Sequence, residues 1–432
     1  MLQNLRSILC GKRGHPTGCQ VWLFFGGVTI LKITLFVLAV SQGFARPFVG
    51  GNARAFYIPA AQHIIQSGQY NDRQTRGFSS MAPAYSYLLA GLLKATADNY
   101  LEIAVVIQMI LDCLTAVLIV WLGRLISAPG VGAVAGFLWL LYPPEVLIST
   151  WITPEPLYTV LLVLSVTLLV VSVKKNNTRF ALVSGLIMGV AALTRAASLL
   201  FAPYWGILVM MRRGRRLWKL ALVVVVGVLL AVLPWTLRNA LVLQDLILIQ
   251  TGTGYVFWQG SLEELWDLKG KVSETAQSTF DEAEAEGIVK PTDQKMSSLD
   301  RWKLRVGLRN YRLRLEERPL SFIPFAAQKF FRLWYGIESA NRLKQIGLGF
   351  FSLLVVPMGA LQIIRWRKSA PHVFWVVAPL CIYFVLLHWI TLPTVRYMIP
   401  VYPLFLLGSV QWVMSRFTNV SPTDVHLKSY TC

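Results

Sequence analysis

The chain has 432 residues, of which 55% are hydrophobic and 14% are charged, and its mean hydropathy is +0.55. This composition excludes a soluble domain and predicts a protein that spans a lipid bilayer. The formal net charge of +20 lies mostly in short loops beside apolar runs, which excludes a nucleic-acid partner and indicates membrane lipids as the surroundings.

Long apolar runs follow one another along the chain without the alternation of a β-barrel, so they predict helices. A hydrocarbon core takes about 20 residues of helix to cross. The predicted spans cover residues 21–43, 101–123, 131–148, 156–173, 220–236, 346–364, 372–390 and 399–415, and 180–211 predicts two short spans or a re-entrant pair that breaks near Arg195. The fold class is therefore an all-α polytopic membrane helix bundle of about ten spans.

Basic loops set the predicted orientation, because Lys and Arg accumulate on the cytoplasmic side. Both termini are then cytoplasmic in a multi-pass protein of the inner (plasma) membrane. We expect three parts. Residues 1–236 form a first transmembrane module with an outer loop at 44–100; residues 237–344 form a mostly helical outer segment, interrupted at Pro319; residues 345–432 form the last spans and a cytoplasmic tail.

Polar residues that interrupt span ends fall on one predicted side, the outer one. They are Asn52 and Tyr57 after the first span, Glu155 after the third, Arg195 after the fifth, Arg238 after the seventh, and Arg396 with Tyr397 after the ninth. Charged groups at membrane depth usually face a protein interior or a wet cavity. Three arginines there predict a site for a phosphate or pyrophosphate, and interfacial snorkelling is the alternative explanation for each.

Several short motifs resemble, in order, those of bacterial polytopic glycosyltransferases of the GT-C fold. That superfamily includes protein O-mannosyltransferases and lipid A aminoarabinose transferases, which are glycosyltransferase family 39-like. The resemblance covers nearly the whole chain. The matching segments are Gly51-Asn52-Ala53 with Tyr57, Gly68-Gln69-Tyr70, Ala82-Pro83-Ala84-Tyr85, Tyr142-Pro143-Pro144, Thr153-Pro154-Glu155-Pro156, Leu193-Thr194-Arg195, Pro234-Trp235-Thr236-Leu237-Arg238-Asn239 and Arg396-Tyr397-Met398.

The resemblance implies an enzyme that moves a hexosyl or pentosyl group from a polyprenyl-phosphate or pyrophosphate donor to a lipid, glycan or protein acceptor at the outer face. Arg195, Arg238 and Arg396 would bind the donor phosphate. Tyr57, Tyr85 and Tyr397 would contact substrate. The donor sugar, the acceptor and the prenyl chain are not readable from these residues.

The expected catalytic base departs from the family pattern. Asn52 stands where the family has Asp, and a neutral amide cannot accept a proton near pH 7. Glu155 at the family's second acidic position, or Asp72 in the first outer loop, would take the role, with Asn52 orienting a substrate. A catalytically inactive relative, or a misalignment, is the remaining explanation.

Other readings stay open beside the transferase. Asp112 in the second span, with Lys32 as its partner, fits a membrane transporter, although no internal repeat accompanies them. The five histidines are too dispersed for a zinc set. No cofactor is certain, and a divalent ion shared by Glu155 and the donor phosphate remains an open alternative.

Overall fold

The computed structural model describes residues 18–213, 215–266, 272–293, 295–337 and 342–417. The predicted cytoplasmic ends, 1–17 and 418–432, lie outside those ranges. The described chain is all-α, as expected, and its single β-bridge pairs Phe48 with Trp151. This bridge joins the segment after the first helix to the segment that precedes Glu155.

Ten α-helices make up the first part of the described chain. They are α2 (Gly18–Ser41), α3 (Ile58–Ser67), α4 (Ala84–Thr96), α5 (Tyr100–Leu125), α6 (Pro129–Leu140), α7 (Pro143–Ile148), α8 (Glu155–Lys175), α9 (Thr178–Thr194), α10 (Phe201–Arg213) and α11 (Arg215–Leu243). The π-helix η1 (Ala53–Tyr57) precedes α3. Helix α11 continues past residue 236, the predicted limit of the first module.

The outer segment contains four α-helices and the last part contains four more. They are α12 (Thr253–Gly260), α13 (Val272–Ala285), α14 (Met296–Glu317), α15 (Pro319–Arg332), α16 (Arg342–Ser369), α17 (Pro371–Ile390), α18 (Val395–Met398) and α19 (Tyr402–Phe417). The break at Pro319 is confirmed: α14 ends before it and α15 begins with it, because proline lacks the N–H that a continuing helix needs.

Seven described helical stretches are long and apolar enough to cross a membrane, so the protein is a multi-pass membrane protein. They are Leu23–Ser41, Ala84–Leu125, Glu155–Lys175, Leu217–Leu243, Arg342–Ser369, Pro371–Ile390 and Val395–Arg416. Three apolar helices, Pro129–Leu140, Thr178–Thr194 and Ala196–Met211, are shorter than 18 residues. The count of ten spans stays a prediction.

The predicted continuous span at 131–148 is wrong. The structure divides it into α6 and the one-and-a-half-turn helix α7, with Leu141 and Tyr142 between them. Pro143 and Pro144 stop the first helix and are tolerated only in the first turn of the next. The predicted break near Arg195 is confirmed, since α9 ends there and Arg195 has extended backbone.

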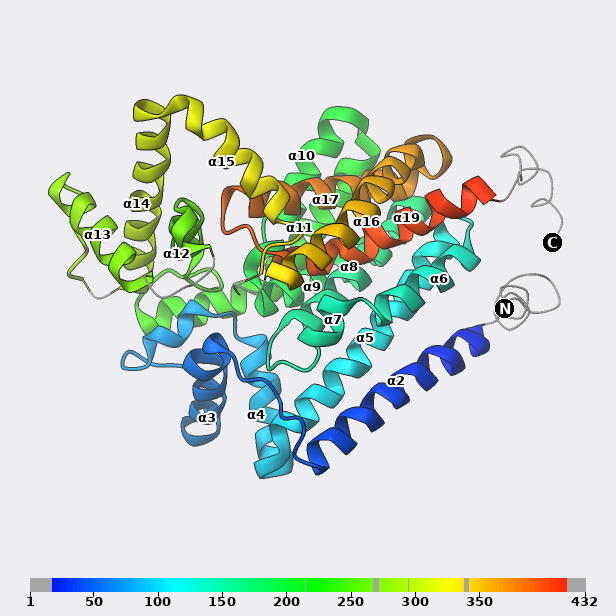
Figure 1. The fold of residues 1–432 in the computed structure, drawn as a ribbon, viewed down its shortest axis with the longest axis horizontal. Helices are drawn as coiled ribbons and strands as arrows, with labels where there is room; N and C mark the ends of the chain where they lie inside the picture. Colours follow the sequence, from blue (N-terminus) through cyan, green and yellow to red (C-terminus); the bar gives the residue numbers. More distant parts are fainter. Residues whose placement is uncertain (1–17, 214, 267–271, 294, 338–341, 418–432) are drawn as a thin grey trace.

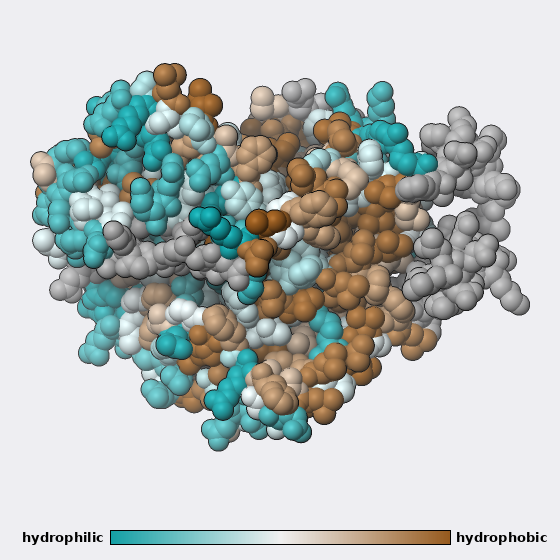
Figure 2. Space-filling model, in the orientation of Figure 1, coloured by the Kyte–Doolittle hydropathy of each residue, from teal (hydrophilic) through white to brown (hydrophobic). Residues whose placement is uncertain are grey.

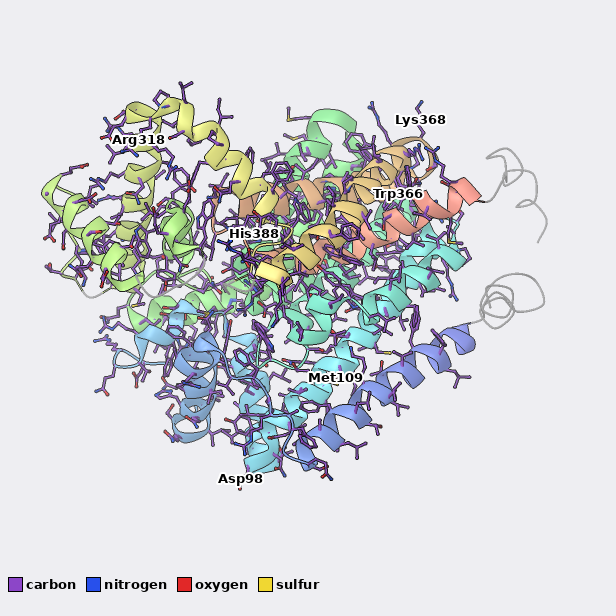
Figure 3. All side chains as sticks on the ribbon, viewed as in Figure 1. Asp98, Met109, Arg318, Trp366, Lys368 and His388 are labelled. Atoms are coloured by element: carbon purple, nitrogen blue, oxygen red, sulfur yellow. The ribbon has the colours of Figure 1, made fainter. Side chains whose placement is uncertain are left out.

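The described start of α2 and end of α19 lie at the same end of the bundle, and α12 to α15 gather at the opposite end (Figure 1). Figure 2 shows hydrophilic residues over that opposite end and a broad hydrophobic surface over the bundle. In Figure 3, Arg318 of the outer segment and Lys368 at the end of α16 lie at opposite ends, with His388 between them. The polar outer segment therefore covers one end of the bundle.

Candidate functional site

Glu155 is the first residue of α8 and is completely buried. Pro154 and Pro156 flank it and fix where the helix begins. A carboxylate at a helix N-terminus is stabilised by the unpaired N–H groups of the first turn. The Thr153 hydroxyl also donates to Oε2 of Glu155. Local sequence thus places one fixed negative charge at this end of the bundle.

Two arginines from distant parts of the chain bind that carboxylate. Arg195 donates to Oε1 of Glu155, and Arg396 donates to both carboxylate oxygens, with a distance of 3.1 Å between Nη2 and Oε2. Arg396 also donates to the Thr153 hydroxyl at 2.7 Å. The arginine side chains remain 19% and 18% exposed while Glu155 is 0% exposed. Two accessible cations on one buried anion leave an excess positive charge that suits an anionic ligand.

Tyr397 lies between Arg195 and His388. The Arg195 guanidinium lies 4.7 Å from the centre of the Tyr397 ring, and the His388 ring is 4.9 Å from it on centroids. His388 is buried, and its Nδ1 makes no hydrogen bond among the described residues. The sequence analysis did not single out His388, because a lone histidine in an apolar run gives no signal of its neighbours.

Tyr57 and Tyr85 form the buried wall of the site. Their rings meet edge to face at 5.3 Å. Burial raises the pKa of the Tyr57 phenol, against the opposing field of Arg195, with smaller effects from Glu155 and Arg396. Tyr57 therefore stays a neutral phenol.

A hydrogen-bond network fixes the segment before Glu155. The Tyr85 hydroxyl accepts from the Thr153 N–H at 2.9 Å and donates to Gln108 at 2.7 Å. Gln108 in turn donates to the carbonyls of Ser149 and Trp151 at 2.9 and 2.7 Å. The sequence analysis gave Gln108 no role. The only feature that could have singled it out is a polar side chain in the middle of an apolar helix.

Arg238 does not join Glu155, which corrects the expectation that three arginines would meet there. It donates instead to the side chain and the backbone carbonyl of Asn71, and it lies 5.2 Å from the ring centre of Trp235. The ring of Tyr70, the residue before Asn71, meets the Trp235 ring edge to face at 5.2 Å. The predicted topology placed Arg238 at the same end of the bundle as Glu155. It could not predict which helices Arg238 would have as neighbours around the bundle.

Asp72 and Asn52 are also apart from the Glu155 cluster. Oδ1 of Asp72 accepts from the backbone N–H groups of Gln74 and Thr75, both at 2.8 Å, in a local turn. The hydrogen bonds from Thr75 are the main reason why the pKa of the Asp72 carboxyl is lowered. Asn52 is exposed before η1, and its side chain makes no capping hydrogen bond.

The described residues do not fit a metal ion at Glu155. Arginine and threonine donors occupy both of its oxygens. Across the described ranges, no three His, Cys, Asp or Glu side chains gather as a ligand set.

Lys32 and Asp112 form the predicted pair, with 3.7 Å between Nζ and Oδ2. Asp112 is 1% exposed, and the fully buried carboxyl of Glu145, which the sequence analysis did not single out, lies beside it. This second polar cluster joins α2, α5 and α7 within the bundle.

No family model matches the sequence, and no curated protein matches it. Among solved structures, the chain is similar to the crystal structure of ArnT from Cupriavidus metallidurans bound to undecaprenyl phosphate. The identity is 12%, the TM-score is 0.43, and the match covers 91% of this chain and 78% of that one.

Proposed function

We propose that this protein transfers a hexosyl or pentosyl group from a polyprenyl-phosphate or pyrophosphate donor to an acceptor hydroxyl at the outer face of the membrane. One observation carries the proposal: Arg195 and Arg396 are partly exposed cations that a buried carboxylate, Glu155, holds together at the end of the bundle covered by the outer segment. A donor with a prenyl tail explains why such a site belongs to a membrane protein.

Arg195 and Arg396 are the proposed phosphate ligands. Guanidinium groups bind phosphate oxygens through paired N–H donors and keep their charge at any physiological pH. Arg238 has a supporting role, because its N–H groups already hold Asn71 of the first outer loop. The Tyr397 ring, stacked under Arg195, limits where that guanidinium can point.

The proposed chemistry is a displacement at the anomeric carbon. The acceptor oxygen forms a bond to that carbon while the bond from the carbon to the phosphate oxygen breaks, and the phosphate leaves with the electron pair. Arg195 and Arg396 stabilise the negative charge that develops on it. The acceptor proton passes to Glu155, whose oxygen becomes free when the phosphate competes for the arginine N–H groups.

Four other residues have supporting roles in this proposal and do not bind the phosphate: Asp72, Asn52, Tyr57 and Tyr85. Asp72 and Asn52 lie in the first outer loop and would contact the acceptor side. Tyr57 and Tyr85 would form the wall behind the reacting groups, and Tyr85 would also keep Thr153 in place. The acceptor class, whether lipid, glycan or protein, is left to experiment.

The test incubates purified protein with a panel of radiolabelled polyprenyl-phosphate sugars and mixed acceptors. Wild type should release sugar from at least one donor, and Arg396→Ala should lower kcat/KM by about 10²- to 10³-fold, because a donor to the leaving phosphate is lost. Arg309→Ala is the matched control, since Arg309 pairs with Glu282 and Glu286 on the outer segment. Equal activity in Arg396→Ala and Arg309→Ala would refute the assignment.

A membrane transporter is the second candidate, and the pair of Lys32 and Asp112 is the observation that favours it. A transporter would lose uptake into proteoliposomes on Asp112→Asn and keep it on Arg396→Ala. The transferase should show the opposite pattern in the sugar-release assay. A wild type that is inactive in both assays would identify a non-catalytic relative.

A further inference from the structure

The loop between α17 and α18 leads directly to Arg396, and the outer segment holds it on two sides. Gly260 packs so closely that a Cβ there would lie 2.2 Å from the Thr391 carbonyl oxygen. On the other side, the Gly336 carbonyl accepts from the Val395 N–H at 2.8 Å and from the Thr394 hydroxyl at 3.1 Å. The loop therefore has little freedom while the outer segment is docked.

Lys329 of α15 is the polar centre of this contact. The side chain is buried, with 2% of the residue exposed. Its Nζ donates to the carbonyls of Gly260 and Ile390 at 2.8 and 2.9 Å, and to the Tyr311 hydroxyl. The Tyr311 hydroxyl donates in turn to the Ile390 carbonyl at 2.7 Å. One ammonium thus ties the end of α12 to the end of α17.

The Nζ of Lys329 lies 5.1 Å from the centre of the Tyr311 ring and 5.6 Å from that of the Phe325 ring. Arg314 of α14 is the charged group whose field reaches it, and Arg314 is itself paired with Glu263 at 3.1 Å. Arg332 on α15 lies over Trp266, and His388 is the titratable group nearest the end of α17. In the described chain no carboxylate lies within ion-pair distance of Lys329. Burial, with a smaller effect from Arg314, lowers the pKa of Lys329 to about 7.

We propose that Lys329 is a positioning residue for Arg396: by joining Gly260 to Ile390 it fixes the loop from which Arg396 reaches Glu155, so that phosphate binding depends on a docked outer segment. This inference rests on the proposed function for its catalytic consequence only. The contact itself is independent of any activity, because it joins the outer segment to the loop in the protein without substrate.

The hydrogen-bond donors of Lys329 match its acceptors in number. The charged ammonium has three N–H groups for three acceptors, the Gly260 and Ile390 carbonyls and the Tyr311 hydroxyl. The pKa of Lys329 is nevertheless lower in this buried contact than in water, so the docked loop binds the proton less tightly than an undocked loop would. Docking should therefore strengthen as the pH rises above about 7.

The first test measures the loop without any substrate. Thr394→Cys, in a background with the native cysteines replaced, places a thiol at a position that is 3% exposed. We expect Lys329→Met to raise its rate of labelling by a water-soluble maleimide about tenfold or more near neutral pH, because the variant lacks the three hydrogen bonds that Lys329 donates around the loop. Lys303→Met is the matched control, a half-buried lysine of α14 whose Nζ lies 4.9 Å from the Tyr255 ring centre, away from the loop. Equal labelling of the parent and Lys329→Met proteins would overturn the proposal.

The second test measures transfer. Lys329→Met should lower kcat by about 10- to 100-fold and raise the donor KM, since a displaced Arg396 serves binding and leaving-group stabilisation less well. Lys329→Arg keeps N–H donors for the same acceptors, so it should restore part of kcat, and because arginine does not titrate it should flatten the pH profile between about pH 6.5 and 8.5. A Lys329→Met profile parallel to that of wild type would contradict the positioning role. If wild type transfers no sugar but the labelling rates differ as expected, the proposed function fails while the contact stands.

Discussion

At the residue scale, the buried charge of Glu155 is stable only because Arg195 and Arg396 compensate it. A buried carboxylate is tolerated because cations and hydrogen bonds compensate its charge, and removing one partner leaves that charge exposed to a medium of low polarity. Arg195 also stacks on Tyr397, so its truncation removes an ion pair and a packing contact together. Stability and the proposed phosphate binding therefore depend on the same side chains.

Arg195→Ala should destabilise the protein by about 3–5 kcal/mol, because Glu155 would stay buried with one cation fewer. The double variant Glu155→Gln with Arg195→Ala should recover much of that loss, since the uncompensated charge is gone. Thermal unfolding in detergent measures both. A double variant that is as unstable as the sum of the two single variants would show that the charge pairing does not govern stability here.

The lowered pKa of Lys329 makes the stability of the protein depend on pH, with stability rising as the pH rises. Its pKa is about 7 in the folded protein and is near 10.5 in an unfolded chain. Between these values the unfolded state binds the extra proton, so the stability contributed by this group rises with pH from about 7 toward 10.5. The wild type should gain thermal stability relative to Lys329→Met over that range. A constant difference between the two across that range would mean that the Lys329 pKa is not lowered.

At the scale of elements, α5 supports the site through one polar side chain. Gln108 links α4, through Tyr85, to the segment from Ser149 to Trp151, which bridges to Phe48 and continues to Glu155. Because α8 begins immediately after this segment, the position of Glu155 depends on how the segment is held. The network therefore holds the segment just before the helix that carries Glu155, the proposed catalytic carboxylate.

Gln108→Leu removes three hydrogen bonds at nearly constant volume. We expect it to lower kcat/KM for sugar transfer by at least about tenfold, because buried polar groups at Tyr85, Ser149 and Trp151 lose their partner. Gln411→Leu is the control, since Gln411 accepts a hydrogen bond from Trp366 at 2.7 Å in the contact between α16 and α19. If both substitutions have equal effects, the network has no special link to Glu155.

At the scale of the whole molecule, the membrane sidedness can be tested with two cysteines. Arg318 and Lys368 are exposed and lie at opposite ends of the protein (Figure 3). In intact cells, an impermeant maleimide should label Arg318→Cys directly and Lys368→Cys only after permeabilisation, because the basic loop at Lys368 is predicted to be cytoplasmic. The reversed pattern would place the Glu155 cluster on the cytoplasmic side.

Much of the architecture was readable from the sequence because hydropathy and charge act locally. The spans near α2, α8, α11, α16, α17 and α19, the break at Arg195 and the break at Pro319 all follow from residues beside them in the chain. The meeting of Glu155 with Arg195 and Arg396, across 40 and 241 residues, was predicted from their shared side of the membrane, but the direct hydrogen bonds between them were not.

The rest depends on packing that a linear pattern does not contain. Arg238 has the same predicted depth as Arg195 but binds Asn71, because helix order around the bundle decides lateral neighbours. Lys329 looked like one more lysine of an amphipathic helix, and its burial depends on α12, α14 and α17 closing over it. Nothing in the sequence around Gly260 indicates why a glycine is needed there. The reason is the close approach of the Thr391 backbone, which leaves no room for a Cβ.

The most direct test of the central claim measures donor binding and sugar transfer separately in Glu155→Gln. Glutamine still accepts hydrogen bonds from Arg195 and Arg396 but cannot take the acceptor proton at neutral pH. Binding of the polyprenyl-phosphate sugar should change by less than about threefold, while the single-turnover transfer rate should fall by about 10²- to 10⁴-fold. A Glu155→Gln protein that transfers sugar at the wild-type rate would contradict the account.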